Sequence, residues 1–224
     1  MEKKIKVVLT GATGMVGEGV LHECLNNGNV SEILVIGRRG YGKSHPKLRE
    51  LVIDNLADLS TVEDQINGFD ACFFCMGVSS VGMDMEVYKK LTYDLTISFA
   101  STLAKHNPGM TFCYVSGAGT DSTESSRLQW ARIKGKTEND LTKLPFAHVF
   151  NFRPGFMLPT KGLSNALKYY KYISWLYYPA KLIYPNAAIR LKDLGIAMIN
   201  SVLNGAPQSV LGVKDILKLS DYSI

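Results

Sequence analysis

The sequence has no apolar run of 18 residues, no cluster of like charges and no linker rich in proline, glycine or serine. Without such an apolar run, a membrane-spanning helix is not expected. The segment Met1–Lys4 leads directly into an apolar stretch without a hydrophobic signal region, so we expect a cytoplasmic protein. The net charge of +5 is modest and the basic residues are scattered, which argues against nucleic acid as a partner. A chain of 224 residues without a linker is expected to form one domain, residues 1–224.

Cysteine is scarce, and the four thiols, Cys24, Cys72, Cys75 and Cys113, all lie in apolar contexts. This is typical of buried thiols in a reducing compartment, so disulfides are not expected. Cys72 and Cys75 have the C-x-x-C spacing of redox and metal sites, but on a strand their side chains would point to opposite faces of the sheet. We therefore predict no metal site.

Three glycines spaced G-x-x-G-x-x-G follow an apolar strand and open a helix. Gly11 would let the chain turn sharply, Gly14 would let the backbone approach a pyrophosphate, and Gly17 would let the helix pack close to the sheet. Free amides at the start of a helix bind phosphate well. The pattern predicts a dinucleotide site, with an ordinary strand-to-helix turn as the alternative. Its residues are Gly11, Thr13, Gly14, Met15, Val16 and Gly17.

Apolar runs typical of strands alternate with segments that have helical periodicity. Such alternation predicts an α/β fold: a doubly wound parallel sheet of the Rossmann type, with helices on both faces. A small helical cap is expected near the C-terminus, over about residues 155–190. The predicted strands are 5–9, 33–37, 51–54, 71–76, 111–116, 147–152 and 209–213, and the predicted helices are 14–27, 58–67, 86–106, 124–143 and 193–203. We expect Asn27-Gly28 to end the first helix in a left-handed conformation, and Gly205 to close the last one.

The residues after the second predicted strand indicate which dinucleotide binds. Arg38 and Arg39 stand about 20 residues beyond the last glycine, where an acidic residue would accept hydrogen bonds from the adenosine ribose. Arginine can pair with a 2′-phosphate, so NADP(H) is favoured over NAD(H), with a plain surface arginine pair as the alternative. Asp54 is expected to accept from the adenine amino group, and Asn55 and Leu56 to line the same wall.

Segment 161–185 holds six tyrosines and a tryptophan among four lysines. Aromatic and basic residues together can mark a membrane interface. Pro179 and Pro185 interrupt the segment, however, and a cap over a substrate cleft or a subunit contact explains the same residues. A membrane surface is therefore the less favoured partner.

Taken together, these residues resemble the short-chain dehydrogenase/reductase superfamily, in its atypical, epimerase-like branch, and are similar to its Tat-interacting-protein-like oxidoreductases. The resemblance spans nearly the whole chain. It implies a Rossmann fold, a bound nicotinamide cofactor, a cleft at the carboxyl ends of the strands and, by analogy, a homodimer. The residues that carry it, besides the glycines and Asp54, are Cys75, Met76, Gly77, Ser116, Lys134, Arg153, Pro154 and Gly155. Of these, Cys75, Met76, Gly77, Lys134, Pro154 and Gly155 are implied to contact the cofactor.

The superfamily transfers hydride with a serine, a tyrosine and a lysine, the last two spaced Y-x-x-x-K. The resemblance implies that Ser116 and Lys134 keep these catalytic positions, but Trp130 stands where the tyrosine would be. An indole N–H does not ionise near neutral pH, so Trp130 cannot serve as the proton donor. Other protonatable residues expected near the cleft are Tyr88, Tyr93, Asp84, Asp121 and Tyr169, and no one of them is favoured.

Two functions remain open from the sequence. The first is an NADP(H)-dependent oxidoreductase or isomerase acting on a small carbonyl or hydroxyl substrate, in which Ser116 and Lys134 position the reactants and another group, or water, moves the proton. The second is a catalytically inactive protein that binds NADP(H) and senses its redox state. Retention of the serine and lysine favours the first, whereas Trp130 favours the second.

Overall fold

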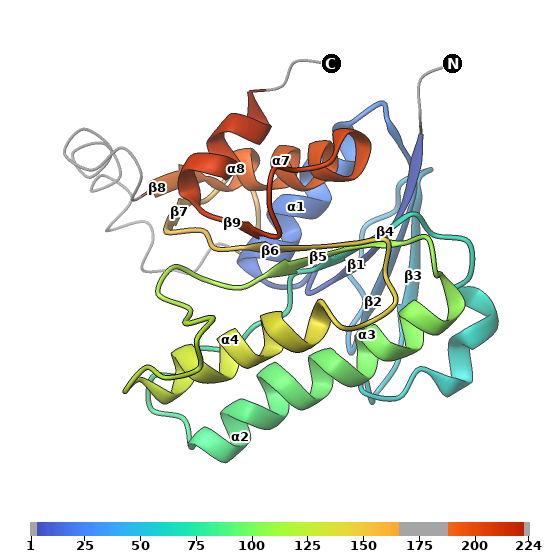
Figure 1. The fold of residues 1–224 in the computed structure, drawn as a ribbon. Coiled ribbons are helices and arrows are strands. Elements are labelled where there is room, and N and C mark those ends of the chain that lie inside the picture. Colours follow the sequence, from blue (N-terminus) through green and yellow to red (C-terminus); the bar gives the residue numbers. More distant parts are fainter. Residues whose placement is uncertain (1–3, 166–187, 222–224) are drawn as a thin grey trace.

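The computed structural model describes residues 4–165 and 188–221, and its centre is a sheet of seven parallel strands (Figure 1). The strand order is β3-β2-β1-β4-β5-β6-β9. Strands at the centre of the sheet are buried along almost their whole length, as apolar runs such as Ile5–Thr10 require when helices cover both faces. The strands are β1 (Ile5–Thr10), β2 (Val30–Gly37), β3 (Leu48–Val52), β4 (Ala71–Phe74), β5 (Thr111–Val115), β6 (His148–Phe152) and β9 (Val210–Leu211).

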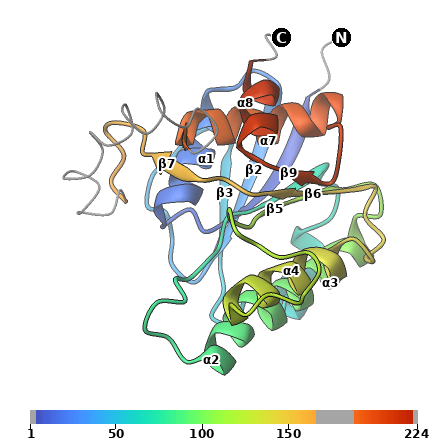
Figure 2. The ribbon, with the colours of Figure 1, turned by 60° about the vertical axis from the view of Figure 1, so that its left-hand side comes forward.

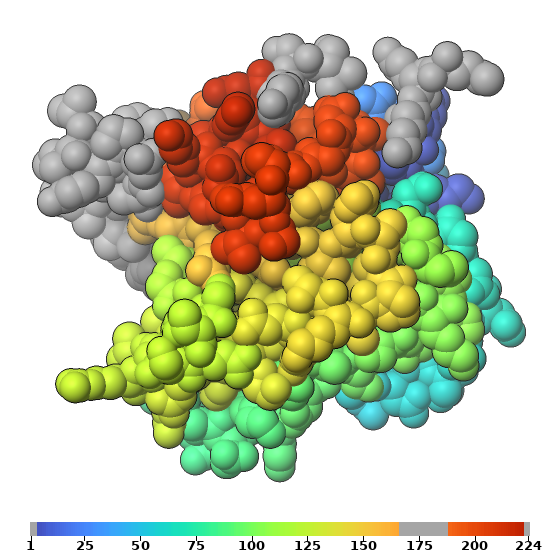
Figure 3. All heavy atoms as spheres, viewed as in Figure 1, coloured from blue at the N-terminus to red at the C-terminus, as the bar shows by residue number. Residues whose placement is uncertain are grey.

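Helices cover both faces of the sheet, which confirms the predicted α/β class (Figures 1 and 2). One face carries α1 (Met15–Asn26), α7 (Leu191–Asn204) and α8 (Val213–Ser220), and the other carries α3 (Leu95–His106) and α4 (Gln129–Leu141). Figure 3 shows both layers from outside, with α7 and α8 in red above α4 in yellow. Each layer encloses its own apolar cluster. Cys75 belongs to one cluster and Cys72 to the other, which confirms that these two thiols lie on opposite faces.

The predicted helix over 86–106 is present but is interrupted once. It consists of α2 (Met85–Lys89), a π-helical turn η2 (Lys90–Asp94) and α3. Asp84 begins α2, because its carboxylate accepts hydrogen bonds from the amides of Glu86 and Val87. The π-turn precedes the part of the helix that approaches the glycine loop.

Several predicted boundaries are wrong for local reasons. The strand expected at 51–54 is Leu48–Val52, which pairs in register with Ile33–Gly37 of β2. The helix expected over 58–67 is a six-residue 3-10 helix η1 (Ser60–Gln65), entered through a turn in which Asp58 accepts from the Ser60 amide.

The ends of two further helices also differ from prediction. The helix expected from residue 124 begins only at Gln129, because the Asp121 carboxylate binds the amides of Thr123, Ser125 and Ser126 and holds this segment as a loop. Asn27 ends α1 in an extended conformation, with φ of −90°, so no left-handed stop occurs there. By contrast, Gly205 has φ of +77° and closes α7 as predicted.

The region predicted as a helical cap is described only at its two ends. These ends are strands rather than helices: β7 (Phe156–Leu158) pairs in parallel with β8 (Ala188–Arg190). Residues 166–187, which hold most of the aromatic segment and Tyr169, lie outside the described residues. Among the helices in 4–165 and 188–221, none is both long and apolar enough to cross a membrane.

Candidate functional site

A cleft of about 470 Å³ opens at the carboxyl ends of β1, β2 and β4. The strand order reverses between β1 and β4, and such a reversal leaves a crevice beyond the strand ends. Eleven of the residues predicted to bind the cofactor line this cleft: Gly11, Thr13, Gly14, Arg38, Arg39, Asp54, Asn55, Leu56, Cys75, Met76 and Gly77. Leu91 and Leu95, from η2 and α3, complete the lining together with Ala12, Val35, Gly37 and Val78.

The glycine loop can form only because two of its residues have no Cβ. Gly11 has φ of +77°, and a Cβ there would lie 2.8 Å from the carbonyl oxygen of Cys75. A Cβ on Gly17 would lie 2.1 Å from the Gly11 carbonyl oxygen. The first turn of α1 is therefore in direct contact with the loop that precedes it, which leaves the loop amides at the edge of the cleft.

Six of the predicted cofactor residues do not line the cleft. Met15 and Val16 begin α1 and pack against the core, and Gly17 is buried behind the loop. Lys134, Pro154 and Gly155 lie further along the same edge of the sheet, beyond β5 and β6. The Pro154 carbonyl accepts from the Ala118 amide at 3.0 Å and ties the end of β6 to the loop after β5.

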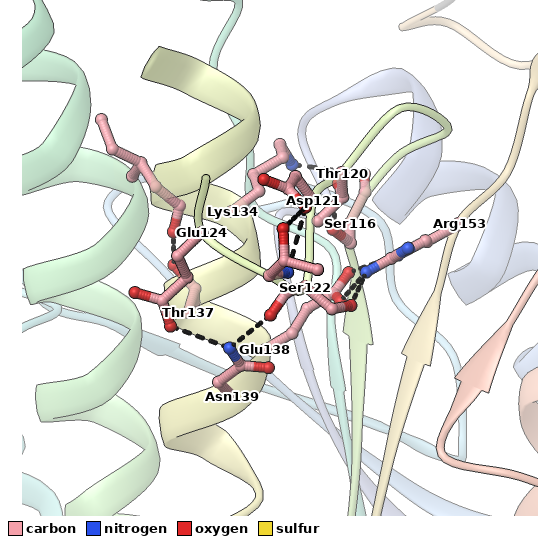
Figure 4. A network of polar contacts seen from close by, with 12 residues as sticks. Ser116, Thr120, Asp121, Ser122, Glu124, Lys134, Thr137, Glu138, Asn139 and Arg153 are labelled. Atoms are coloured by element: carbon pink, nitrogen blue, oxygen red, sulfur yellow. Dashed lines mark hydrogen bonds and ion pairs between the residues drawn. The ribbon is translucent and has the colours of Figure 1, made fainter. Parts of the chain in front are cut away.

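Ser116 and Lys134 meet at the carboxyl end of β5 (Figure 4). Ser116 directly follows this strand, and its amide donates to the Phe152 carbonyl at 2.8 Å. The Lys134 ammonium donates to the Ser116 carbonyl at 3.2 Å and lies 5.6 Å from the centre of the Tyr114 ring. The Ser116 hydroxyl shares a hydrogen bond of 2.9 Å with the hydroxyl of Thr120, a residue that our sequence analysis did not identify.

Burial lowers the pKa of Lys134 to about 8, although the Glu138 carboxylate acts in the opposite direction. Lys134 forms no ion pair with any carboxylate in the described part of the chain. It is therefore a lysine that changes its charge near physiological pH.

Trp130 lies one helical turn before Lys134, in the first turn of α4. Its indole ring packs on Gly119, where a Cβ would lie 3.1 Å from the ring edge. Gly119 has φ of +87°, so the loop between Ser116 and Thr120 turns beneath the indole. The residue at the tyrosine position thus packs its apolar ring against the loop after β5.

The other protonatable residues considered from the sequence are otherwise engaged. Tyr88 is fully buried, and burial raises the pKa of its hydroxyl. The Tyr93 hydroxyl donates to Asp140 at 2.7 Å, Asp84 caps α2, and the Asp121 carboxylate accepts from three amides and a hydroxyl of its own loop. Tyr169 lies outside the described residues.

Glu138 and Arg153 form an ion pair behind Lys134 (Figure 4). The Arg153 Nε donates to Glu138 Oε1 at 3.0 Å, and its terminal nitrogen also donates to the Ser122 hydroxyl. Glu138 is almost completely buried, and its carboxylate is held in place by Arg153. Its spacing of four from Lys134 is a sequence signal that could have identified it.

Glu18 is a second buried carboxylate that our sequence analysis missed. It lies in the first turn of α1 and accepts hydrogen bonds from the amides of Ser164 and Asn165 at 3.0 and 2.7 Å. The Lys43 ammonium lies 3.7 Å away. Glu18 therefore attaches the chain after β7 to the helix that begins at the glycine loop. Elsewhere among the described residues, no group of three or more histidine, cysteine or acidic side chains could hold a metal ion.

A model of the NAD dependent epimerase/dehydratase family matches residues 7–123, which is more than half of the chain. The chain belongs to this family. Its members bind NAD(P), and the match covers the glycine loop and the strand ends that line the cleft.

Two curated relatives are similar to this chain over about 70% of its length. "Protein FMP52, mitochondrial" of Candida albicans is 28% identical over 71% of this chain and 70% of its own length. "Protein HTATIP2" of Rattus norvegicus is 27% identical over 68% of this chain, and the match spans 62% of that protein. This agrees with the predicted resemblance to the Tat-interacting-protein-like branch.

Solved structures of an epimerase and of a reductase share the fold of this chain. A UDP-N-acetylglucosamine 4-epimerase from Methanobrevibacter ruminantium has a TM-score of 0.65 at 16% identity, over 93% of this chain and 75% of that one. An NADPH-bound carbonyl reductase from chicken fatty liver has a TM-score of 0.61 at 12% identity, over 95% of this chain and 98% of that one. At such identities the likeness is one of fold.

The comparisons correct the predicted location. Relatives from Candida albicans, Debaryomyces hansenii and Kluyveromyces lactis are named mitochondrial proteins. The expectation of a cytoplasmic protein is therefore wrong.

Proposed function

We propose that this family member is an NADP(H)-dependent oxidoreductase that acts on a small carbonyl or hydroxyl substrate. The observation that carries the proposal is the pair of arginines at the cleft. Arg38 and Arg39 both line it directly beyond β2, and no acidic residue stands at the end of that strand to accept from a ribose. Two guanidinium groups at this point favour the 2′-phosphate of NADP(H) over the free hydroxyl of NAD(H).

The residues of the cleft fit a dinucleotide. Gly14 is exposed, and a Cβ there would meet only the Gly11 carbonyl oxygen, at 3.4 Å, so a diphosphate can approach the loop backbone. Asp54, Asn55 and Leu56 line the cleft together with Leu91 and Leu95, and this mixture of polar and apolar side chains suits a flat adenine ring. When bound, NADPH would supply a hydride.

Each residue at the Ser116 end of the edge has a physical task in this proposal. The hydroxyl groups of Ser116 and Thr120 are already hydrogen-bonded to each other, so the pair can orient a carbonyl oxygen without first being ordered. The Lys134 ammonium uses one N–H on the Ser116 carbonyl and has two more to offer the nicotinamide ribose. Trp130 packs on Gly119 and so supports the loop that carries Thr120.

A second candidate is a protein that binds NADP(H) without turning it over. It is favoured by Trp130, because the indole occupies the position of the usual proton donor and has no proton to exchange near neutral pH.

Replacement of Arg38 tests the choice of cofactor. We expect Arg38→Ala to weaken NADPH binding by about 10–100-fold, the value of one charge-assisted hydrogen bond, and NADH binding by less than about threefold. Calorimetric titration of each cofactor gives the two dissociation constants. Arg49→Ala is the matched control, because Arg49 pairs with Glu32 on the outer strands. Equal losses for NADPH and NADH in Arg38→Ala would refute the assignment, and absence of binding by the parent protein would refute the cofactor site itself.

A further inference from the structure

The residues that meet at the end of β5 also indicate which group could deliver a proton to the substrate in place of the usual tyrosine. We propose that Lys134 is itself the proton donor, acting on a carbonyl oxygen held by the Ser116 and Thr120 hydroxyls. The inference rests on the proposed function, because it assumes that the cleft holds NADPH. It gives Lys134 a chemical role beyond holding the cofactor.

The position of the ammonium supports this role. Lys134 donates to the Ser116 carbonyl at 3.2 Å, and Ser116 carries the hydroxyl bonded to Thr120 at 2.9 Å. The charged group and the two hydroxyls, which belong to buried residues, therefore lie within one residue of each other at the carboxyl end of β5 (Figure 4). Because one hydroxyl of the pair donates to the other, one O–H remains to donate to a substrate oxygen, which would then lie close to the ammonium.

The other protonatable side chains near this end of the sheet are poorly suited to be the proton donor. Tyr88 and Tyr114 are buried to about 1% exposure, and burial raises the pKa of both hydroxyls. Tyr93 donates to Asp140, on the side of α4 that carries Lys136 and Lys143. Asp121 is held as a carboxylate by its loop, which lowers its pKa to about 2, so it carries no proton at neutral pH.

Lys134 can release a proton because its nearest carboxylate is already paired. Glu138, one turn along α4, is held by Arg153 from the end of β6. Among the described residues, Lys134 is partly buried and has no ion pair of its own, and burial lowers its pKa to about 8. A lysine that remained ion-paired would hold its proton too tightly to donate it at neutral pH.

In the described part of the chain, several elements carry charged or titratable groups around Lys134, besides Tyr88 and Tyr93 on the helical segments α2 and η2 that pack against α4. The helix α4 contributes Glu138, β5 contributes the ring of Tyr114, the end of β6 contributes Arg153, and the loop before α4 contributes Asp121. Glu138 is the carboxylate whose charge acts on Lys134. Arg153 is therefore a positioning residue, because it acts on Lys134 only through Glu138.

The step balances as an ordinary carbonyl reduction. The carbonyl carbon gains a hydride from NADPH, and the carbonyl oxygen gains the proton from the Lys134 ammonium, so that an alcohol, NADP⁺ and a neutral amine result. The amine then regains a proton from water. In the reverse direction, the neutral amine removes the proton from the alcohol.

The first test measures the pKa of Lys134 directly and does not require the protein to turn over a substrate. Protein labelled with ¹³C-lysine is titrated by NMR, free and with NADPH, and the Lys134 signal is assigned by its loss in Lys134→Arg. We expect a midpoint near pH 8. Glu138→Gln should lower this midpoint by about 0.5–1 pH unit, and Arg153→Gln, which frees the carboxylate, should raise it by a similar amount. Glutamine was chosen in both variants because its amide can hydrogen-bond to the partner that remains, which is Arg153 in Glu138→Gln and Glu138 in Arg153→Gln. Lys136→Met is the control, because Lys136 binds Asp140 on the same helix and should leave the midpoint unchanged.

The second test follows NADPH consumption with two activated carbonyl probes, 4-nitrobenzaldehyde and 9,10-phenanthrenequinone. We expect kcat to fall as the pH rises through the Lys134 midpoint. The pH at which kcat falls should be lower in Glu138→Gln and higher in Arg153→Gln. Lys134→Arg keeps a positive charge but cannot release its proton, so kcat should drop by about 100-fold or more while the NADPH dissociation constant changes by less than about tenfold.

The outcomes separate the two proposals. Three results would overturn the role of Lys134 and leave the cofactor proposal standing. They are a Lys134 midpoint above pH 10, a pH profile of kcat that is the same in Glu138→Gln and Arg153→Gln as in the parent protein, and an unchanged rate in Lys134→Arg. NADPH binding without reduction of either probe would overturn the proposed reductase, and the role of Lys134 with it. Absence of NADPH binding would overturn the cofactor site.

Discussion

The two ends of the carboxyl edge of the sheet differ in how they are built. At the β1 end, backbone geometry sets the site: a left-handed glycine, a close contact between Gly17 and Gly11, and amides that open towards a cleft. At the β5 end, side chains set the site: the hydroxyl pair of Ser116 and Thr120, the ion pair of Arg153 and Glu138, and Lys134, which has no ion pair among the described residues. Backbone geometry tolerates few substitutions, whereas side-chain chemistry can be reassigned residue by residue. This explains how a family fingerprint can persist at one end of the edge while Trp130 stands at the other.

The largest effect that would separate the two ends is expected from Gly17→Ala. The new Cβ would lie 2.1 Å from the Gly11 carbonyl oxygen, which is a backbone atom, and the Cβ itself is fixed rigidly to the α1 backbone, so neither can turn away. We expect a loss of at least about 3 kcal/mol of unfolding free energy and a rise of about 100-fold or more in the NADPH dissociation constant. Denaturant unfolding and calorimetry measure the two quantities. Gly28→Ala is the control, because its Cβ would meet nothing within 4 Å. A Gly17→Ala variant that binds NADPH normally would show that the first turn of α1 does not shape the phosphate site.

The same difference explains what the sequence could predict. The glycine spacing, the apolar strands and the residues at their ends predicted the sheet and most of the cleft, because local backbone rules and strand order place these groups together. The Thr120 hydroxyl and the Arg153–Glu138 pair could not be predicted in the same way. Their contacts depend on the path of the loop before α4, where the Asp121 carboxylate replaces the first helical turns that periodicity had indicated.

A smaller effect, confined to the β5 end, is expected from Gly135→Ala. Its Cβ would lie 1.7 Å from the Asp121 carbonyl oxygen, so the loop before α4 must move away from the helix. We expect a loss of about 2 kcal/mol of unfolding free energy and loss of probe reduction, while the NADPH dissociation constant stays within about tenfold. Unfolding, calorimetry and the 4-nitrobenzaldehyde assay measure these effects, with Gly109→Ala as the open-space control. If NADPH binding fell as far as in Gly17→Ala, the two ends would not be independent.

The smallest effect concerns the pH dependence of this loop. Hydrogen bonds from Thr123, Ser125 and Ser126 lower the pKa of Asp121 to about 2, against about 3.8 for a free aspartate. Because the folded pKa is the lower one, the stabilisation is complete above the unfolded pKa and is lost as the pH falls towards 2. We expect Asp121→Asn to lower the melting temperature by a few degrees at pH 6, and this difference to shrink between pH 4 and pH 2. Asp58→Asn, where a single residue, Ser60, supplies the hydrogen bonds, should give a smaller difference. A melting-temperature difference that stayed constant down to pH 2 would mean that the ionised carboxylate does not hold the loop. A change in the NADPH affinity of Asp121→Asn at pH 6 would mean that the loop affects the β1 end of the edge.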